Sequence, residues 1–314
     1  MTQMITNHGN KMAEAELIYH VHIGKISIVV FWMLLVAVLF SCVTRHHPPF
    51  TVRPPEHRNL QAFENRLQKA VSASTHLTME KIGRVDYPDF QAFLCRIRFQ
   101  AVQSPRYRVL ISAVIHGNEP ASAEATARFV EDLIGSPEKY SNLAIDIVPI
   151  VNPWGWVHDI RYNQAGIDIN RDFATFNAQE SNIIKQFIQN TSYDLMIDLH
   201  EDPTARGFYL YQYGLADKNV CEKIVATIKD LGYPIEQNVR MIILKTENGI
   251  IDAPMWGLWY MRLTGQLSIA NYYRLNNSRF VFTVETPTSL LWEDRLKMQK
   301  TAVTILLDLM MDDK

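Results

Sequence analysis

Four short, almost uninterrupted apolar runs constrain the fold of this chain more than any other feature. They are RVLISAVI at 108–115, LAIDIVPIV at 143–151, YDLMIDL at 193–199 and RFVFTV at 279–284. Runs of this length and composition are typical of strands that are buried on both faces, as the strands of parallel sheets are. We therefore expect each run to form a strand in the interior of one sheet.

Helical patterns alternate with these runs along the chain. They cover 120–134, where Pro120 suits the first turn of a helix, and then 181–189, 216–231 and 290–311, while 208–213 indicates a further short strand. Alternating strands and helices favour a sheet that is covered by helices on both faces. The sequence thus predicts an α/β fold with a mixed, largely parallel central sheet flanked by helices.

The composition is that of an ordinary globular domain. The chain has 314 residues, of which 47% are hydrophobic and 20% charged, and this is long enough to bury a large core without disulfides. The net charge is −2 and no block of lysine or arginine stands out, so we expect no nucleic-acid partner. Three cysteines at 42, 95 and 221 form neither a disulfide framework nor a cysteine-based zinc site. Cys95 lies in an alternating apolar run and is expected to be a small buried hydrophobe.

The N-terminal part contains a different kind of apolar segment. Ile26 to Thr44 includes no charged residue and approaches the roughly 20 apolar residues that cross a bilayer. It is either an uncleaved signal anchor or a leader ending in LFSC, a lipobox-like motif in which Cys42 would be lipidated, and the sequence leaves both open. We expect a leader at 1–45, a proline-rich tether at 46–55 and a catalytic domain at 56–314. The domain would be membrane-anchored on the periplasmic or extracytoplasmic side.

Residues with metal-binding or acid–base chemistry follow three of the four apolar runs. His116 and Glu119 follow the first run, His200 follows the third and Glu285 follows the fourth. In open α/β sheets, ligands bind at the carboxyl edge of the strands, so these side chains should lie together. Two histidines, one carboxylate and an open position are the ligand set of a catalytic zinc ion. The joint placement therefore predicts one zinc ion, although a His-x-x-Glu motif alone is common on exposed turns.

The segment between these residues resembles the zinc carboxypeptidase family related to carboxypeptidase A, in a clan shared with aspartoacylase and succinylglutamate desuccinylase. HGNE at 116–119 is followed by NPWG at 152–155, RYN at 161–163 and GIDINRDF at 166–173. This order is similar to the HxxE, NPxG, RxN and GxDxNR order of the family, and a strand-end histidine and glutamate follow. The resemblance covers about 116–285 and departs from the common NPDG at Trp154. The short spacing from Glu119 to His200 also suits the aspartoacylase and desuccinylase branch.

The resemblance implies roles for individual residues. His116, Glu119 and His200 would bind zinc, and Glu285 would act as the general base. Arg161 would stabilise the oxyanion that forms from the scissile carbonyl.

The same resemblance implies how substrate is bound. Asn170 and Arg171 would bind its terminal carboxylate, which a guanidinium matches in two-point contact. Asp172 would order its loop rather than contact substrate.

These roles predict a zinc-dependent hydrolase that cleaves an amide bond next to a free carboxylate. The first expectation is a metallocarboxypeptidase acting on peptides or cell-wall peptides. The nearest alternative is an amidohydrolase of the aspartoacylase and desuccinylase type, whose substrate is an N-acyl amino acid with a free carboxylate. A third alternative is a non-catalytic binding module with the same zinc fold, against which the presence of both Glu285 and Arg161 argues.

Overall fold

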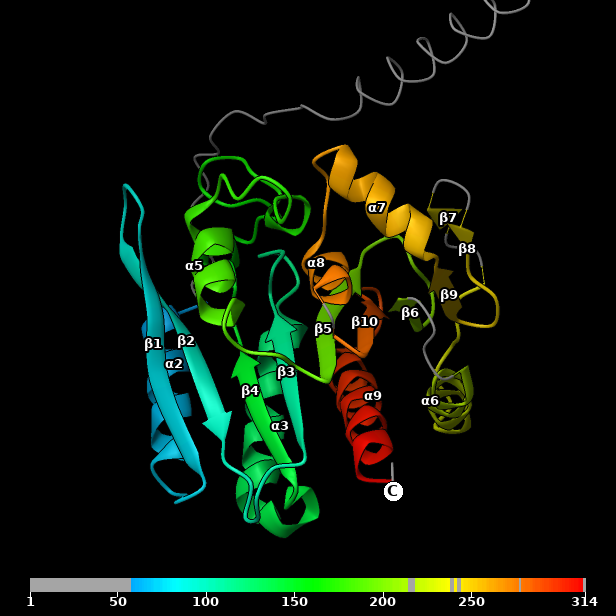
Figure 1. Ribbon diagram of the computed structural model, residues 1–314, viewed down its shortest axis with the longest axis horizontal. Coiled ribbons are helices and arrows are strands. Elements are labelled where there is room, and N and C mark those ends of the chain that lie inside the picture. The colour runs from blue at the N-terminus through cyan, green and yellow to red at the C-terminus, as the bar shows by residue number, and fades with distance from the viewer. Residues whose placement is uncertain (1–57, 214–217, 238–239, 242–243, 277, 313–314) are drawn as a thin grey trace, which may run out of the picture. The chain divides into compact units, whose positions relative to one another are not determined.

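The computed structural model describes residues 58–213, 218–237, 240–241, 244–276 and 278–312 (Figure 1). The predicted leader with its apolar segment at 26–44, including Cys42, and the tether at 46–55 lie outside these residues. Within the described part of the chain, no helix is long and apolar enough to cross a membrane.

A mixed sheet of eight strands forms the centre of the domain, in the order β1-β2-β4-β3-β5-β10-β6-β9 (Figure 1). The strands are β1 (Leu77–Asp86), β2 (Gln91–Phe99), β3 (Tyr107–Ala113), β4 (Leu143–Val148), β5 (Leu195–Asp202), β6 (Tyr209–Tyr213), β9 (Ile250–Ala253) and β10 (Phe280–Pro287). The four neighbouring strands β4, β3, β5 and β10 are parallel. Each of these four strands is formed from most of one apolar run, so the prediction that the runs form interior parallel strands is confirmed.

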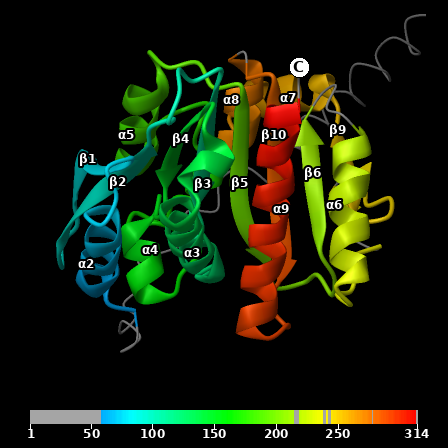
Figure 2. The same ribbon diagram turned by 90° about the horizontal axis from the view of Figure 1, so that it is seen from below.

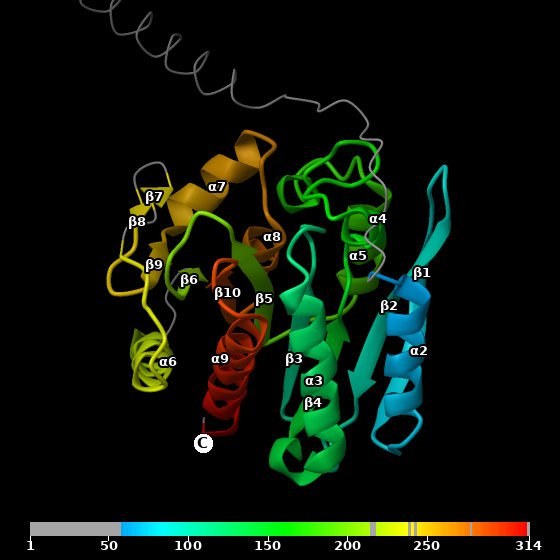
Figure 3. The ribbon, with the colours of Figure 1, turned by 180° about the vertical axis from the view of Figure 1, so that it is seen from behind.

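Helices cover both faces of this sheet (Figure 2). One face packs against α2 (Leu60–Val71), α3 (Ala121–Gly135), α6 (Lys218–Asp230) and α9 (Trp292–Asp312). The other packs against α5 (Gln179–Ile188), α7 (Met255–Leu263) and α8 (Ile269–Leu275). Figure 3 shows α3 and α9 lying over the central strands, and these two helices also contact each other. Apolar side chains fill both layers, which makes the sheet the core of the domain.

Shorter elements connect this framework. They are the α4 helix (Pro153–His158), 3-10 turns at Pro137–Tyr140 and Ile169–Arg171, and a separate two-stranded sheet of β7 (Arg240–Met241) and β8 (Leu244–Lys245). Asn152 caps α4 with its side-chain oxygen, which accepts from the backbone N–H of Gly155 at 2.9 Å. Proline follows Asn152 at the first helical position, where its missing N–H costs no hydrogen bond.

The structure corrects several details of the predicted elements. The sheet is parallel at its centre, but β1, β2 and β6 run antiparallel to their neighbours β2, β4 and β10. The run at 143–151 ends as a strand at Val148, because Pro149 has no N–H to continue the ladder. Val151 then donates to the carbonyl of Ala113. The β1–β2 hairpin and the helices α2, α7 and α8 were not predicted from the sequence. Cys95 is buried on β2, as predicted.

Candidate active site

Three neighbouring strands bring the predicted site residues together. β5 lies between β3 and β10 in the sheet, and His116 and Glu119 follow β3, whereas His200 and Glu285 belong to β5 and β10. His200 and Glu285 are paired in the parallel register and therefore project to the same face of the sheet. Both lie within their strands rather than after them, because β5 and β10 each continue for two residues beyond these positions.

The turn that carries His116 and Glu119 is tight and strained. Val114, directly after β3, has a φ of 52°, which is a genuine outlier for a β-branched residue. Gly117 packs so closely against α4 that an added Cβ would lie 1.9 Å from the carbonyl carbon of Gly155. Only glycine fits at position 117, and the bend directs both predicted ligand side chains toward β5.

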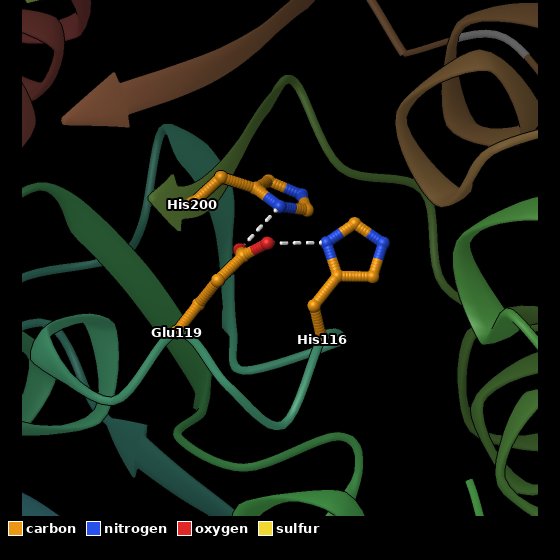
Figure 4. A group of neighbouring side chains, drawn as sticks. All are labelled: His116, Glu119 and His200. Carbon is orange, nitrogen blue, oxygen red and sulfur yellow. Dashed lines mark hydrogen bonds and ion pairs between the residues drawn. The ribbon is translucent and has the colours of Figure 1, made fainter. Parts of the chain in front are cut away.

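Glu119 lies between the two histidines and contacts both (Figure 4). Its Oε1 is 2.6 Å from Nδ1 of His116 and its Oε2 is 2.8 Å from Nδ1 of His200. All three side chains are buried, and one donor atom from each lies within 4.8 Å of the others. Burial by itself would raise the pKa of Glu119, but the two imidazoles beside it hold that pKa well below its usual range. The three side chains thus form one compact cluster of nitrogen and oxygen donors.

Asp198 orients His200 through the ring nitrogen that does not face Glu119. One oxygen of this fully buried carboxylate lies 2.7 Å from Nε2 of His200, and the other accepts a hydrogen bond from Oγ of Ser112 at 2.5 Å. With its proton on Nε2, the ring directs the Nδ1 lone pair at the carboxylate of Glu119. Two lone pairs facing each other repel unless a cation or a proton lies between them. This donor set, with a carboxylate behind one histidine, fits a zinc ion.

Sequence reasoning missed the role of Asp198. The signal was present as Asp-x-His at 198–200, because residues two apart on a strand share one face. Burial by itself would lower the pKa of His200, but the carboxylates of Asp198 and Glu119 raise it well above its ordinary value.

Arg161 lies at the edge of the triad, where Asp168 fixes it. Its Nε and Nη2 donate to Oδ2 of Asp168 at 3.1 and 3.0 Å, and its Nη1 is 3.7 Å from Oε1 of Glu119. Asp168 also contacts Nε2 of His116 at 3.2 Å. Burial by itself would raise the pKa of Asp168, but His116, Arg161 and Arg171 lower it far below its usual range. The GIDINR segment thus supplies a carboxylate that orients both a predicted ligand and the predicted oxyanion-binding arginine.

Glu285 is half-buried beside this cluster, opposite His200 in the register of β10 and β5. Burial raises its pKa to about 8, with Glu119 and Asp202 adding to the rise and His200 opposing it. A carboxylate with a raised pKa next to a donor cluster is suited to accept a proton near neutral pH.

Asn170 and Arg171 lie on the same side as the triad, but in different settings. Asn170 is buried, its Oδ1 accepts from the backbone N–H of Ile269 at 3.0 Å, and its Nδ2 is 3.5 Å from Nε2 of His200. Arg171 is partly exposed and donates to the carbonyl of Asn170 at 2.7 Å. Among the described residues it forms no ion pair, but its charge helps to lower the pKa of Asp168.

Asp172 orders the loop that follows, as predicted. Its carboxylate accepts from the side chains of Thr175 and Ser181 at 2.6 Å each, and from the backbone N–H groups of Asn177 and Ala178 at 2.9 and 2.8 Å. All its contacts are within the loop and the start of α5, so it holds the segment after Arg171 in place.

Sequence comparisons point to two related groups of enzymes. The family model described as the succinylglutamate desuccinylase/aspartoacylase catalytic domain matches residues 105–245. Carboxypeptidase 2 of Trichophyton tonsurans is 26% identical over 165 residues, which cover 50% of this chain and 30% of that protein. The chain therefore spans less than a third of the length of this curated relative.

Comparison with solved structures shows the fold. A candidate metallopeptidase from Shewanella denitrificans has a TM-score of 0.67 at 19% identity, covering 85% of this chain and 98% of that one. A metallo-carboxypeptidase from Burkholderia cenocepacia has a TM-score of 0.59 at 16% identity, covering 81% of this chain and 69% of that one. The architecture of the described domain is thus that of metallocarboxypeptidases.

Proposed function

We propose that this chain, which belongs to the zinc carboxypeptidase-like family, is a zinc-dependent hydrolase that cleaves an amide bond next to a free carboxylate. The observation that carries the proposal is the buried cluster of His116, Glu119 and His200 with a carboxylate of raised pKa, Glu285, beside it. Metal ligands alone would be compatible with a purely structural zinc site, whereas metal ligands beside a general base are suited to hydrolysis.

Each side chain contributes a separate part of the reaction. His116, Glu119 and His200 would hold a zinc ion, which would supply Lewis-acid chemistry by lowering the pKa of a water molecule and polarising the substrate carbonyl. The carboxylate of Glu285 accepts the proton of the attacking water and returns it to the leaving amine.

Arg161 stabilises the negative charge that develops on the scissile carbonyl oxygen. Asp168 holds two of its nitrogens, so the third, Nη1, remains directed at the triad. A donor that is fixed before the reaction costs no reorganisation when the charge forms.

Arg171 binds the free carboxylate of the substrate, with Asn170 beside it. The guanidinium of Arg171 is partly exposed, and its planar donors match a carboxylate in two-point contact. This arrangement favours a metallocarboxypeptidase that releases the C-terminal residue of a peptide or cell-wall peptide, in line with the name of the curated relative.

A second candidate function is the hydrolysis of N-acyl amino acids. It is favoured by the match of residues 105–245 to the succinylglutamate desuccinylase/aspartoacylase catalytic domain. The same triad, base and carboxylate site serve both reactions, so the two differ in what lies on the acyl side of the bond. Turnover of matched peptides, muropeptides and N-acyl amino acids, each with and without a chelator, separates them.

The substitution Glu285→Gln tests catalysis itself. Glutamine keeps the size of the side chain but accepts no proton at neutral pH, so we expect turnover to fall at least ~100-fold while zinc content and thermal stability stay close to those of the parent. Glu131→Gln, an exposed site on α3, is the matched control. Undiminished turnover in Glu285→Gln would contradict the assigned base.

Glu201 is a poor substitute for Glu285 as the base. Its two oxygens accept from Nη1 of Arg295 at 2.6 Å and from the backbone N–H of Ala121 at 2.7 Å, so neither is free to take a proton from water.

Metal analysis provides the other test of the proposal. The parent should contain about one zinc ion per chain, and full zinc content in His200→Ala would contradict the ligand assignment.

We also propose that the segment at 26–44 anchors the domain at a membrane, with the domain on the extracytoplasmic side. The support is the uncharged apolar sequence of that segment and the proline-rich tether after it.

A further inference from the structure

Arg58, the first described residue, reaches the ligand-bearing turn from a distant part of the chain. Its side chain is 8% exposed although it precedes α2 at the edge of the described domain. Nη1 donates to the carbonyl of Gly117 at 3.1 Å and to the carbonyl of Trp156 at 3.0 Å. Nη2 forms an ion pair with Asp159 at 2.8 Å. A single guanidinium thus binds the HGNE turn and the end of α4 at the same time.

Arg58 bridges two segments, the HGNE turn and α4, whose mutual contact is the strained part of the site. The turn leaves β3 through the unfavourable φ of Val114, and Gly117 is pressed against Gly155. Conformations of this kind are energetically costly and persist only where surrounding contacts hold them. The carbonyl of Gly117 lies between the two ligands of the turn, so a shift of this peptide displaces His116 and Glu119 relative to each other.

The surroundings of Arg58 give the contact its strength. Burial lowers the pKa of the Arg58 guanidinium, and Asp159 offsets this effect by pairing with it. Trp156 also presents its carbonyl near the C-terminus of α4, where the helix dipole favours a positive charge. Removing the guanidinium would leave the carbonyls of Gly117 and Trp156 without this donor.

We infer that Arg58 is a positioning residue, which holds the His116–Glu119 turn in the conformation that binds the metal. The inference rests on the proposed function in that the turn must bind zinc. The contacts of Arg58 are with Gly117, Trp156 and Asp159 and not with the triad side chains, so it acts through the peptide of Gly117. An arginine at the start of the domain, next to the tether, therefore determines how well the active-site turn binds its ion.

Zinc affinity of the full chain, measured by competition with a chromogenic chelator, tests the inference. We expect Arg58→Gln to bind zinc about tenfold more weakly or worse, as when other residues that orient ligands are changed. Arg58→Lys keeps the charge but cannot serve both carbonyls and Asp159 together, so its loss should be smaller. Arg66→Gln is the matched control, because Arg66 is an exposed arginine on α2 that pairs with Glu124.

Thermal unfolding with chelator and with saturating zinc separates positioning from general support of the fold. A positioning role predicts a smaller gain in Tm on adding zinc for Arg58→Gln than for the parent. A lower Tm without zinc together with parent-like zinc affinity would overturn the inference.

A second variant keeps the test decisive if Arg58→Gln does not fold. Asp159→Asn alters a half-exposed residue in a left-handed conformation that asparagine accepts, and it removes the charge that holds Arg58. Parent-like zinc affinity in both Arg58→Lys and Asp159→Asn would overturn the inference. If the parent bound no zinc, both the proposed function and this inference would be overturned. If the parent binds zinc and only the variants bind it more weakly, both are supported.

Discussion

Replacing Asp198 should weaken zinc binding by an amount that depends on the replacement. Asp198 is fully buried and uses one oxygen for His200 and the other for Ser112. Changes to carboxylates that orient ligating histidines typically cost 10–100-fold in metal affinity, which corresponds to about 1.4–2.8 kcal/mol. The two substitutions Asp198→Asn and Asp198→Ala should lie at opposite ends of this range.

The contacts of Asp198 give the reason. Asparagine can still accept from Nε2 of His200 through its oxygen and donate to Ser112 through its amide, so only the charge is lost. Charge-assisted hydrogen bonds are roughly twice as strong as neutral ones, and we expect about a tenfold loss of affinity. Alanine leaves the N–H of His200 and the hydroxyl of Ser112 without partners, at about 1–3 kcal/mol each in folding stability. It also frees the imidazole to rotate, so the loss of affinity should approach 100-fold.

Chelator competition and thermal unfolding together provide the assay. Asp146→Asn is the matched control, because Asp146 is also a buried sheet aspartate but pairs with Arg98 and Tyr193 instead of a ligand. The control should lose stability and keep its zinc affinity. If Asp198→Ala lost stability in the same way and kept the affinity of the parent, the orienting role of Asp198 would be refuted.

Three further predictions address stability, substrate and processing. Burial raises the pKa of Glu180, which accepts from Tyr87 and Asn163, so the folded protein holds a proton that the unfolded chain releases. The free energy of unfolding should therefore fall as pH rises from the ordinary glutamate range through the raised pKa, and urea unfolding of Glu180→Gln should lack this decline. Arg171→Ala should lower turnover of free-acid substrates by about 10–100-fold and leave the already poor turnover of amidated ones unchanged; equal parental rates on both would exclude the carboxypeptidase assignment. If Cys42 is lipidated, Cys42→Ser should block cleavage before position 42, which mass spectrometry of the N-terminus detects, whereas an intact Met1 in the parent would indicate an uncleaved anchor.

The sequence alone was sufficient to predict the central strands and the four residues at the heart of the site. Each apolar run marks a buried strand through its local composition, and in parallel strands the carboxyl ends meet at one edge. His116, Glu119, His200 and Glu285 could therefore be placed together before any coordinate was known. The β1–β2 hairpin and the amphipathic helix α2, in which polar residues interrupt the apolar positions, lack such a run and were not predicted.

Only the tertiary structure decided how these residues are held. The contact between Arg58 and Gly117 joins positions 59 apart, and the contact between Arg161 and Asp168 depends on the course of a loop. The raised pKa of Glu285 arises from burial and from the charge of Glu119, which lies on the turn after a different strand, β3. A local pattern reports which face of an element is apolar, but it carries no information on which distant groups desolvate or neutralise a given charge, because that depends on the packing of the whole domain.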